Sequence, residues 1–145
     1  MIRKATLEDL PILMELERVC FKDSRYSREQ IEWILRGRDE VTYLYFQDSN
    51  AIGSLMLSLH GDMGRVISVG VHPDWRGKGV ARELMNVADK WFLDLGATVV
   101  DLEVGVNNKD ALNLYRSLGY EVVRVLKKYY PGKEDAFHLR KKLQV

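Results

Sequence analysis

Residues 72–85 read HPDWRGKGVARELM, and this stretch decides the fold that we expect. A β-rich run, RVISVGV at residues 65–71, ends immediately before it, and apolar residues at helical spacing follow it as far as Leu95. Two glycines, Gly77 and Gly79, lie at the junction among three basic residues. The order is therefore strand, tight turn and helix, and the first N–H groups of such a helix have no partner within it.

The turn itself, RGKGVA at residues 76–81, has the composition of an anion site. Its two glycines let the main chain approach a bulky anion, and Arg76, Lys78 and Arg82 place positive charge around it. We expect a pyrophosphate cradle, with a flexible loop carrying solvated basic residues as the alternative. The phosphate-loop pattern and the third glycine of a dinucleotide fingerprint are both missing, which argues against nucleotide hydrolysis and a Rossmann cofactor.

Length and composition indicate one soluble globular domain over residues 1–145, with 46% hydrophobic and 30% charged residues. A net charge of +1 argues against a nucleic-acid partner, since such modules carry a marked basic excess. The single Cys20, placed in an apolar helical pattern, excludes an internal disulfide and is expected to be buried. The sequence shows neither an apolar leader nor a membrane-length span, so we expect a cytoplasmic protein without a membrane partner. The three histidines are too scattered to predict a metal site.

Hydrophobic periodicity predicts an α/β protein with a largely antiparallel sheet. Helices are expected from Thr6 to Cys20, after the capping-box pattern at residues 27–30, over residues 77–95 and over residues 110–118. Strands are expected at residues 2–5, 41–47, 51–59, 65–71, 98–104, 120–130 and 136–143. Gly70 lies inside one of these strands, where a missing side chain predicts a bulge or the close approach of another backbone, and hints at a ligand.

Two blocks of sequence carry a family resemblance. Arg76-x-x-Gly79-x-Ala81 resembles the Gln/Arg-x-x-Gly-x-Gly/Ala signature of the GCN5-related N-acetyltransferase (GNAT) superfamily, and DLEVGVNNKDALNLYRSLGYE at residues 101–121 resembles that family's second half. FKDSRYS at residues 21–27 and KKYYPGKEDAFHL at residues 127–139 are similar to segments of N-terminal protein acetyltransferases, most of all the ribosomal-protein alanine acetyltransferases and their archaeal relatives. The resemblance covers essentially the whole chain. It implies the GNAT fold: about seven strands, about four helices, and strands 4 and 5 splayed around a cofactor.

The resemblance also implies the cofactor, acetyl-coenzyme A, which leaves as coenzyme A. Its pyrophosphate is expected on the backbone N–H groups of residues 77–82, and its pantetheine arm beside the strand that ends at Val71. The residues expected to contact it are Val69, Gly70, Val71, Arg76, Gly77, Lys78, Gly79, Val80, Ala81, Arg82, Asn108 and Tyr115. No metal is implied.

Three residues are expected to carry the chemistry. An amine attacks only when neutral, and a peptide α-amino group with a pKa of roughly 8 is mostly protonated at neutral pH. The resemblance makes Glu103 the base, acting through water or on the amine directly. Burial among apolar neighbours would raise its pKa toward a value useful for that task; an exposed carboxylate paired with a lysine is the alternative. The Val71 N–H is the candidate for stabilising the oxyanion, and Tyr115 for protonating the departing thiolate, although a tyrosine at helical spacing also suits a core position.

Phe21, Tyr26, Tyr129 and Tyr130 are expected to form a slot for a protein or peptide N-terminus, with ribosomal proteins among the candidates. We expect a monomer or a weak homodimer. A GNAT enzyme acetylating a small amine, such as a polyamine or antibiotic, is one alternative, and a non-catalytic acyl-coenzyme A-binding module is another. Gly105 stands where bacterial alanine acetyltransferases typically have an arginine, so an arginine contact is lost, and residues 23–25 depart from the family's first loop. The accepted first residue therefore stays open.

Overall fold

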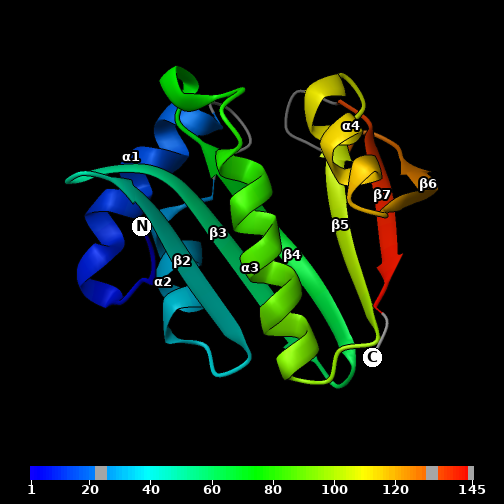
Figure 1. Cartoon of the computed structure of the whole chain (residues 1–145), viewed down its shortest axis with the longest axis horizontal. Helices are drawn as coiled ribbons and strands as arrows, with labels where there is room; N and C mark the ends of the chain where they lie inside the picture. The colour runs from blue at the N-terminus through cyan, green and yellow to red at the C-terminus, as the bar shows by residue number, and fades with distance from the viewer. Residues whose placement is uncertain (22–25, 130–133, 144–145) are drawn as a thin grey trace.

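The computed structural model describes residues 1–21, 26–129 and 134–143. In these ranges seven strands form one sheet in the order β1-β2-β3-β4-β5-β7-β6 (Figure 1). The elements are β1 (Ile2–Lys4), η1 (Leu7–Asp9), α1 (Leu10–Cys20), α2 (Arg28–Arg36), β2 (Glu40–Gln47), β3 (Asn50–His60), β4 (Met63–Val71), η2 (Pro73–Trp75), α3 (Val80–Asp94), β5 (Val99–Gly105), α4 (Lys109–Ser117), β6 (Glu121–Leu126) and β7 (Ala136–Lys142). The predicted mixed α/β fold, with a mostly antiparallel sheet and four α-helices, is confirmed.

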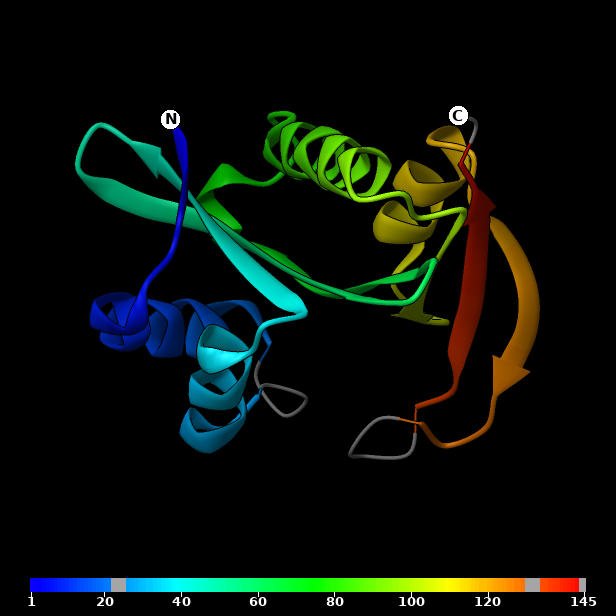
Figure 2. The same cartoon turned by 90° about the horizontal axis from the view of Figure 1, so that it is seen from below.

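Helices cover the sheet on both faces. Figure 2 shows α1 and α2 on one side, and α3 and α4 on the other. Successive side chains of a strand point to opposite faces, so β3 contributes to both cores: Leu55 and Leu57 pack in the cluster under α3, and Met56 packs in the cluster under α1 and α2. All three side chains are fully buried. These two cores cover both faces of the sheet around β3.

Local sequence signals set the helix ends. The predicted capping box is present, because Ser27 Oγ accepts a hydrogen bond from the Gln30 N–H at 3.2 Å and the Gln30 side chain accepts one from the Ser27 N–H at 2.8 Å. Helix α3 begins at Val80 rather than at Gly77. Gly77 and Gly79 have φ values of +76° and +84°, which glycine adopts without strain and which interrupt a right-handed helix.

The sheet opens between β4 and β5. In the described sheet these strands pair in parallel where residues 63–65 lie beside residues 99–101. Beyond that short pairing the strands diverge, and Figure 1 shows them spreading apart toward one end of the molecule. The predicted splay of the fourth and fifth strands is confirmed. We call this opening, bordered by residues 66–71 of β4 and 102–105 of β5, the seam.

The prediction of a bulge at Gly70 is wrong. Gly70 pairs regularly with Ser54, and the register shift lies three residues earlier: Met56 pairs with Ser68 and Leu57 with Val66, so that Ile67 is the extra residue. The missing side chain of Gly70 makes room for an aromatic ring instead of another backbone. A Cβ at Gly70 would lie 2.9 Å from Cε2 of Phe21.

The strand expected at residues 120–130 is shorter than predicted. β6 ends at Leu126, and Lys128 adopts a φ of +53°, which turns the chain out of the extended conformation. The Asp135 carboxylate holds this turn by accepting a hydrogen bond from the Lys128 N–H at 2.8 Å. Among the helices of the described ranges, none has both the length and the apolar character needed to cross a bilayer.

Candidate active site

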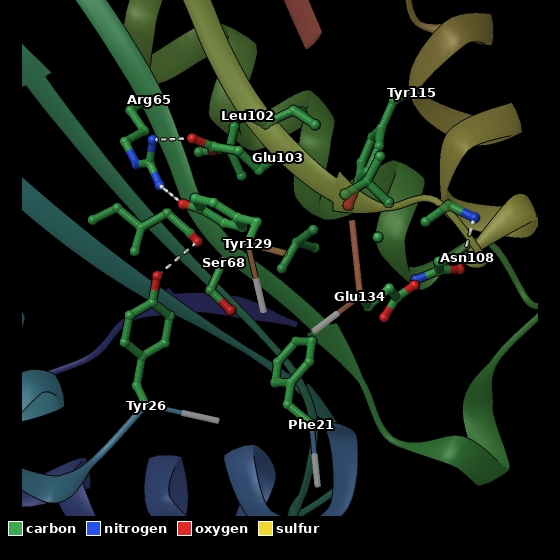
Figure 3. A pocket seen from close by; sticks show the side chains of 16 residues that line it. Phe21, Tyr26, Arg65, Ser68, Leu102, Glu103, Asn108, Tyr115, Tyr129 and Glu134 are labelled. Atoms are coloured by element: carbon green, nitrogen blue, oxygen red, sulfur yellow. Dashed lines mark hydrogen bonds and ion pairs between the residues drawn. The ribbon is translucent and has the colours of Figure 1, made fainter. Parts of the chain in front are cut away.

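A cavity of about 200 Å³ lies at the seam, and Figure 3 shows the side chains around it. Its wall combines β4 and β5 with α4 and with the segments that follow α1 and β6. Seven of the predicted site residues line it: Phe21, Tyr26, Val69, Glu103, Asn108, Tyr115 and Tyr129. The fold thus gathers in one place residues that are widely separated along the chain.

An ion pair crosses the seam. Arg65 Nη1 on β4 lies 2.5 Å from Glu103 Oε1 on β5, and Arg65 Nη2 donates to the Tyr129 hydroxyl at 3.4 Å. The Glu103 side chain is 11% exposed, whereas that of Arg65 is 39% exposed. Glu103 is therefore neither isolated among apolar groups nor paired with a lysine on the surface. The guanidinium fixes the direction of its carboxylate at the edge of the cavity.

Helix α4 contributes two residues on the opposite side. The Tyr115 side chain is buried, and its ring makes an edge-on contact with Tyr120 at 6.2 Å between centroids. Asn108 caps α4, because its Oδ1 accepts a hydrogen bond from the Ala111 N–H at 3.3 Å. Both residues line the cavity. Capping fixes the orientation of Asn108 and the direction in which α4 presents Tyr115.

The segment after α1 forms a further part of the wall. The Tyr26 hydroxyl donates a hydrogen bond to the carbonyl of Ile67, the extra residue of the β4 bulge, at 3.3 Å. The Tyr26 N–H donates to Glu17 Oε1 at 3.0 Å. Glu17 is 1% exposed, and burial raises the pKa of its carboxyl to about 7 although the Tyr26 N–H opposes the shift. The bulge and a buried carboxylate thus hold Tyr26 from two directions.

The main chain of β4 presents polar groups to the seam. The His72 N–H donates to the Ile52 carbonyl of β3 at 2.8 Å. Since successive residues of a strand direct their N–H groups to opposite edges, those of Val71 and Val69 face the seam. The Val71 carbonyl accepts a hydrogen bond from Arg76 Nε at 3.1 Å. Arg76 therefore anchors the end of β4 as well as adding charge nearby.

The N-terminus of α3 lies where β4 ends. The first backbone bond of the helix runs from the Glu83 N–H to the Gly79 carbonyl at 3.1 Å, so the N–H groups of residues 80–82 precede the helical ladder. The Val80 side chain is buried in the core. Arg82 Nη2 donates to Ser117 Oγ at 3.1 Å, and Lys78 lies over the Trp75 ring at 5.2 Å. The turn combines backbone donors with nearby positive charge.

Gly105 stands at the position where the family typically has an arginine, and another side chain fills the space beside it. A Cβ at Gly105 would lie 2.6 Å from Oε1 of Glu134, so the Glu134 carboxylate fills the space beside this glycine. The same Oε1 accepts a hydrogen bond from the Asn107 N–H at 3.1 Å. An acidic group therefore stands at the position where an arginine side chain would begin.

Comparison with known proteins decides the family. The model of the acetyltransferase (GNAT) family matches residues 10–120. The chain belongs to this family. An N-alpha-acetyltransferase of Sulfurisphaera tokodaii is 27% identical to this GNAT protein over 149 aligned residues, covering 94% of this chain and 89% of its own.

Solved structures agree on the fold of this GNAT protein. The ribosomal-protein-S18-alanine N-acetyltransferase from Escherichia coli superposes with a TM-score of 0.92 at 22% identity, covering 100% of this chain and 94% of its own. NAA60 of Arabidopsis thaliana, solved in complex with acetyl-CoA, superposes with a TM-score of 0.86 at 20% identity, covering 99% and 98%. The likeness to both structures is one of fold.

Sequence reasoning missed three residues of this GNAT site. Arg65 and Glu134 line the cavity, and Glu17 supports it from behind. Arg65 is the one charged residue in an apolar strand, which could have marked it as a site residue. Its partner Glu103 lies 38 residues away, so the pair could not be found from local sequence. Glu134 belongs to the Glu-Asp-Ala segment of the family resemblance, which implies no role for it. Tyr130 and residues 23–25 lie outside the described residues, and in the described ranges no group of three His, Cys, Asp or Glu side chains could hold a metal ion.

Proposed function

We propose that this protein transfers the acetyl group of acetyl-coenzyme A to the α-amino group of a protein or peptide N-terminus. One observation carries the proposal. The cavity at the seam brings Glu103 and Tyr115, candidates for moving protons, beside the Val69 main chain and the aromatic side chains of Phe21, Tyr26 and Tyr129. A thioester donor would enter from the α3 side of the seam, and an amine from the side of the aromatic residues.

The residues around α3 fit the diphosphate of coenzyme A. Gly77 and Gly79 both have positive φ values, and no heavy atom lies within 4 Å of a Cβ placed on either in the described structure. A diphosphate can therefore approach the backbone closely, where the helix N-terminus and nearby cations attract it. Arg76, Lys78 and Arg82 lie around the same turn. Gly70, also expected at the cofactor, pairs with Ser54 and contacts Phe21, so its contribution to this site is to admit that ring.

The main chain of β4 fits the pantetheine arm. The Val69 and Val71 N–H groups face the seam, where the pairing with β5 has ended. They can bind pantetheine amides much as a neighbouring strand would. The Val71 N–H is the donor that we assign to the carbonyl oxygen of the thioester, which becomes negative as the amine adds; a preorganised donor at such a position is a large source of rate enhancement.

Glu103 is the group that we assign to the amine proton. Acetyl-coenzyme A would supply the acetyl group as a thioester. The protein must remove a proton from the substrate's amine and deliver a proton to the departing sulfur. Glu103 accepts the proton through water or directly, while Arg65 keeps its carboxylate at the cavity edge. Tyr115 donates the proton that the thiolate needs, and its buried position beside Asn108 matches that task.

The aromatic residues fit an extended peptide. Phe21, Tyr26 and Tyr129 line the cavity from segments on its outer side, and their rings offer apolar surface next to hydroxyl groups. The N-alpha-acetyltransferase of Sulfurisphaera tokodaii supports the same substrate class. Tyr130, the fourth expected contact, lies outside the described residues and stays a prediction.

Steady-state kinetics test this proposal. The purified protein would be given acetyl-coenzyme A with a library of peptides that vary at the first two residues, in parallel with polyamines and with peptides that have a blocked N-terminus and an internal lysine. We expect acetylation of free N-termini, located by mass spectrometry. Acetylation confined to small amines would favour the alternative substrate class, and cofactor binding without any transfer would favour a non-catalytic binding module.

A further inference from the structure

Glu134 is a carboxylate of the cavity wall that the proposed chemistry does not use. It lies two residues before β7, and its Oε1 accepts a hydrogen bond from the Asn107 N–H at 3.1 Å. Its carboxyl atoms occupy the space beside Gly105, where a Cβ would lie 2.6 Å from Oε1 and 3.1 Å from Oε2. The absence of a side chain at Gly105 therefore gives Glu134 its place in the wall.

The charge of Glu134 is uncompensated among its described neighbours. In the described ranges, no lysine, arginine or histidine nitrogen lies within 4.0 Å of its carboxylate. Glu103 differs, because Arg65 lies 2.5 Å from it and neutralises it. The cavity therefore contains one neutral ion pair and one carboxylate whose described partner is a backbone N–H.

The remaining wall is also suited to a positive group. The rings of Phe21, Tyr26 and Tyr129 line the same cavity. Aromatic faces attract ammonium and guanidinium groups, most strongly where water is partly excluded. A negatively charged group of a ligand would be repelled by the Glu134 carboxylate. Arg65 would not compensate for this repulsion, because it already pairs with Glu103.

The two carboxylates lie at different parts of the wall. Figure 3 shows Glu134 beside Asn108, on the side of the cavity away from Arg65 and Glu103. In the proposed function the reacting α-amino group is served by Glu103. A peptide whose α-amino group lies at Glu103 leaves Glu134 available to bind a second positive charge on the same peptide.

We propose that Glu134 makes the enzyme selective for N-termini that carry a second positive charge, a lysine or arginine at the first or second residue. This inference rests on the proposed function. The ammonium or guanidinium of that side chain binds the Glu134 carboxylate and packs against the aromatic rings. A carboxylate-bearing residue at the same position is repelled, so that the site discriminates on both signs of charge.

A matched peptide series tests the proposal. Peptides identical except for lysine, methionine or glutamate at the first or the second residue would be compared by kcat/KM for acetyl transfer. For at least one of the two positions we expect lysine to exceed methionine by about tenfold, the factor for an ion-pair contribution of about 1.4 kcal/mol, and glutamate to be the poorest. Raising the salt concentration should reduce this lysine advantage.

Two variants change the charge or the place of the carboxylate. Glu134→Gln should reduce the lysine-to-methionine ratio to about one. Gly105→Ala keeps the charge but displaces the carboxylate, because the added methyl group would overlap the far end of a flexible side chain; it should reduce the ratio too. Glu121→Gln, which removes an exposed carboxylate of β6, is the matched control and should keep the full ratio.

The outcomes separate this inference from the proposed function. A lysine-to-methionine ratio that Glu134→Gln and Gly105→Ala both leave unchanged overturns the assignment of Glu134, as does peptide acetylation at equal rates across the charge series. Transfer to polyamines with no peptide acetylated overturns the proposed function instead. Circular dichroism of each variant identifies loss of folding, and the second variant then decides the test.

Discussion

The two edges of β4 differ in how their backbone is used. On one edge β3 pairs with β4 from His60 and Met63 to Gly53 and Val71, interrupted by the bulge at Ile67. On the other edge β5 pairs with residues 63–65 and then departs. β4 therefore satisfies its backbone polar groups on the β3 side, whereas on the β5 side most of its backbone has no pairing strand in the described sheet. In the proposed function, the binding site arises because this sheet pairing ends early.

The two edges of β4 also differ in polarity and exposure. The β3 side is apolar, with Leu55, Met56 and Leu57 fully buried. The seam holds an ion pair, of which Arg65 keeps 39% of its side-chain surface exposed. Substitutions on the β3 side should thus affect stability, and substitutions at the seam should affect transfer.

Glu103→Gln should have the largest effect, and it acts at the seam. The amide keeps the shape of the side chain but cannot accept the amine proton, so we expect kcat/KM for peptide acetylation to fall by about 100-fold or more. The thermal unfolding midpoint should change little, because an ion pair with so exposed an arginine is worth at most about 1 kcal/mol. Release of the free coenzyme A thiol measures the rate.

The control for this variant is Glu121→Gln, on the exposed strand β6. It should retain the activity of the unmodified protein. Activity of Glu103→Gln within a few-fold of that level would remove Glu103 from the mechanism.

Leu55→Ala tests the β3 side. Removing a fully buried leucine leaves a cavity under α3, and we expect the free energy of unfolding to fall by about 2–5 kcal/mol in urea titrations. The folded fraction should still bind acetyl-coenzyme A. Leu93→Ala, at a position of α3 that is 43% exposed, is the matched control and should cost much less. Equal losses in the two variants would contradict the distinction between a packed platform and an open seam.

The buried carboxyl of Glu17 should make the stability of the protein depend on pH. Burial raises the pKa of this carboxyl from an ordinary value of 4.5 to about 7, so the folded state binds a proton more tightly than the unfolded state. Its favourable contribution is full below pH 4.5 and is lost as the pH rises through about 7, by up to about 3 kcal/mol. Glu17→Gln should lack this loss.

Urea unfolding between pH 5 and pH 8 is the measurement, with roughly one titration per pH unit, and the quantity of interest is the difference between the unmodified protein and Glu17→Gln. That difference cancels the titration of other groups. A difference that does not vary over this interval would show that Glu17 is not the buried carboxyl that the geometry describes.

Gly79→Ala should have the smallest effect. A φ of +84° strains any residue with a Cβ, by about 1 kcal/mol, although no heavy atom lies within 4 Å of that Cβ in the described structure. The KM for acetyl-coenzyme A should rise severalfold as the turn relaxes. Gly61→Ala, at a φ of +64° with equally open surroundings, should show the same loss of stability and an unchanged KM. Equal KM values for acetyl-coenzyme A in the two variants would show that Gly79 does not contribute to cofactor binding.

The parts of the fold that sequence could predict depend on contacts between near neighbours. The capping box of Ser27 and Gln30 joins residues three positions apart, and the glycine turn before α3 depends on the φ values of two residues. The order of strands and helices follows from such signals. The sequence predicts a bulge at Gly70, whereas the structure has it at Ile67. A register shift depends on two strands, and the sequence of one strand does not specify it.

The site was predictable where the family resemblance supplied positions, and not where two distant segments meet. Glu103 and Tyr115, to which the resemblance assigns catalytic roles, both line the cavity, and those roles stay predictions. The partner of Glu103 lies 38 residues away on β4, and Glu134 reaches Gly105 from beyond β6. Both contacts depend on tertiary packing, which leaves no local pattern in the sequence.

The most direct test of the account is a titration of the ¹⁵N-labelled protein with acetyl-coenzyme A, followed by amide resonances. We predict large shifts for the N–H groups that face the seam, those of Val69 and Val71, and for the first turn of α3. The His72 N–H, already bonded to the Ile52 carbonyl, should shift less than its neighbour Val71. Shifts centred elsewhere, with Val69, Val71 and the α3 turn unchanged, would contradict the claim that the open edge of β4 holds the donor.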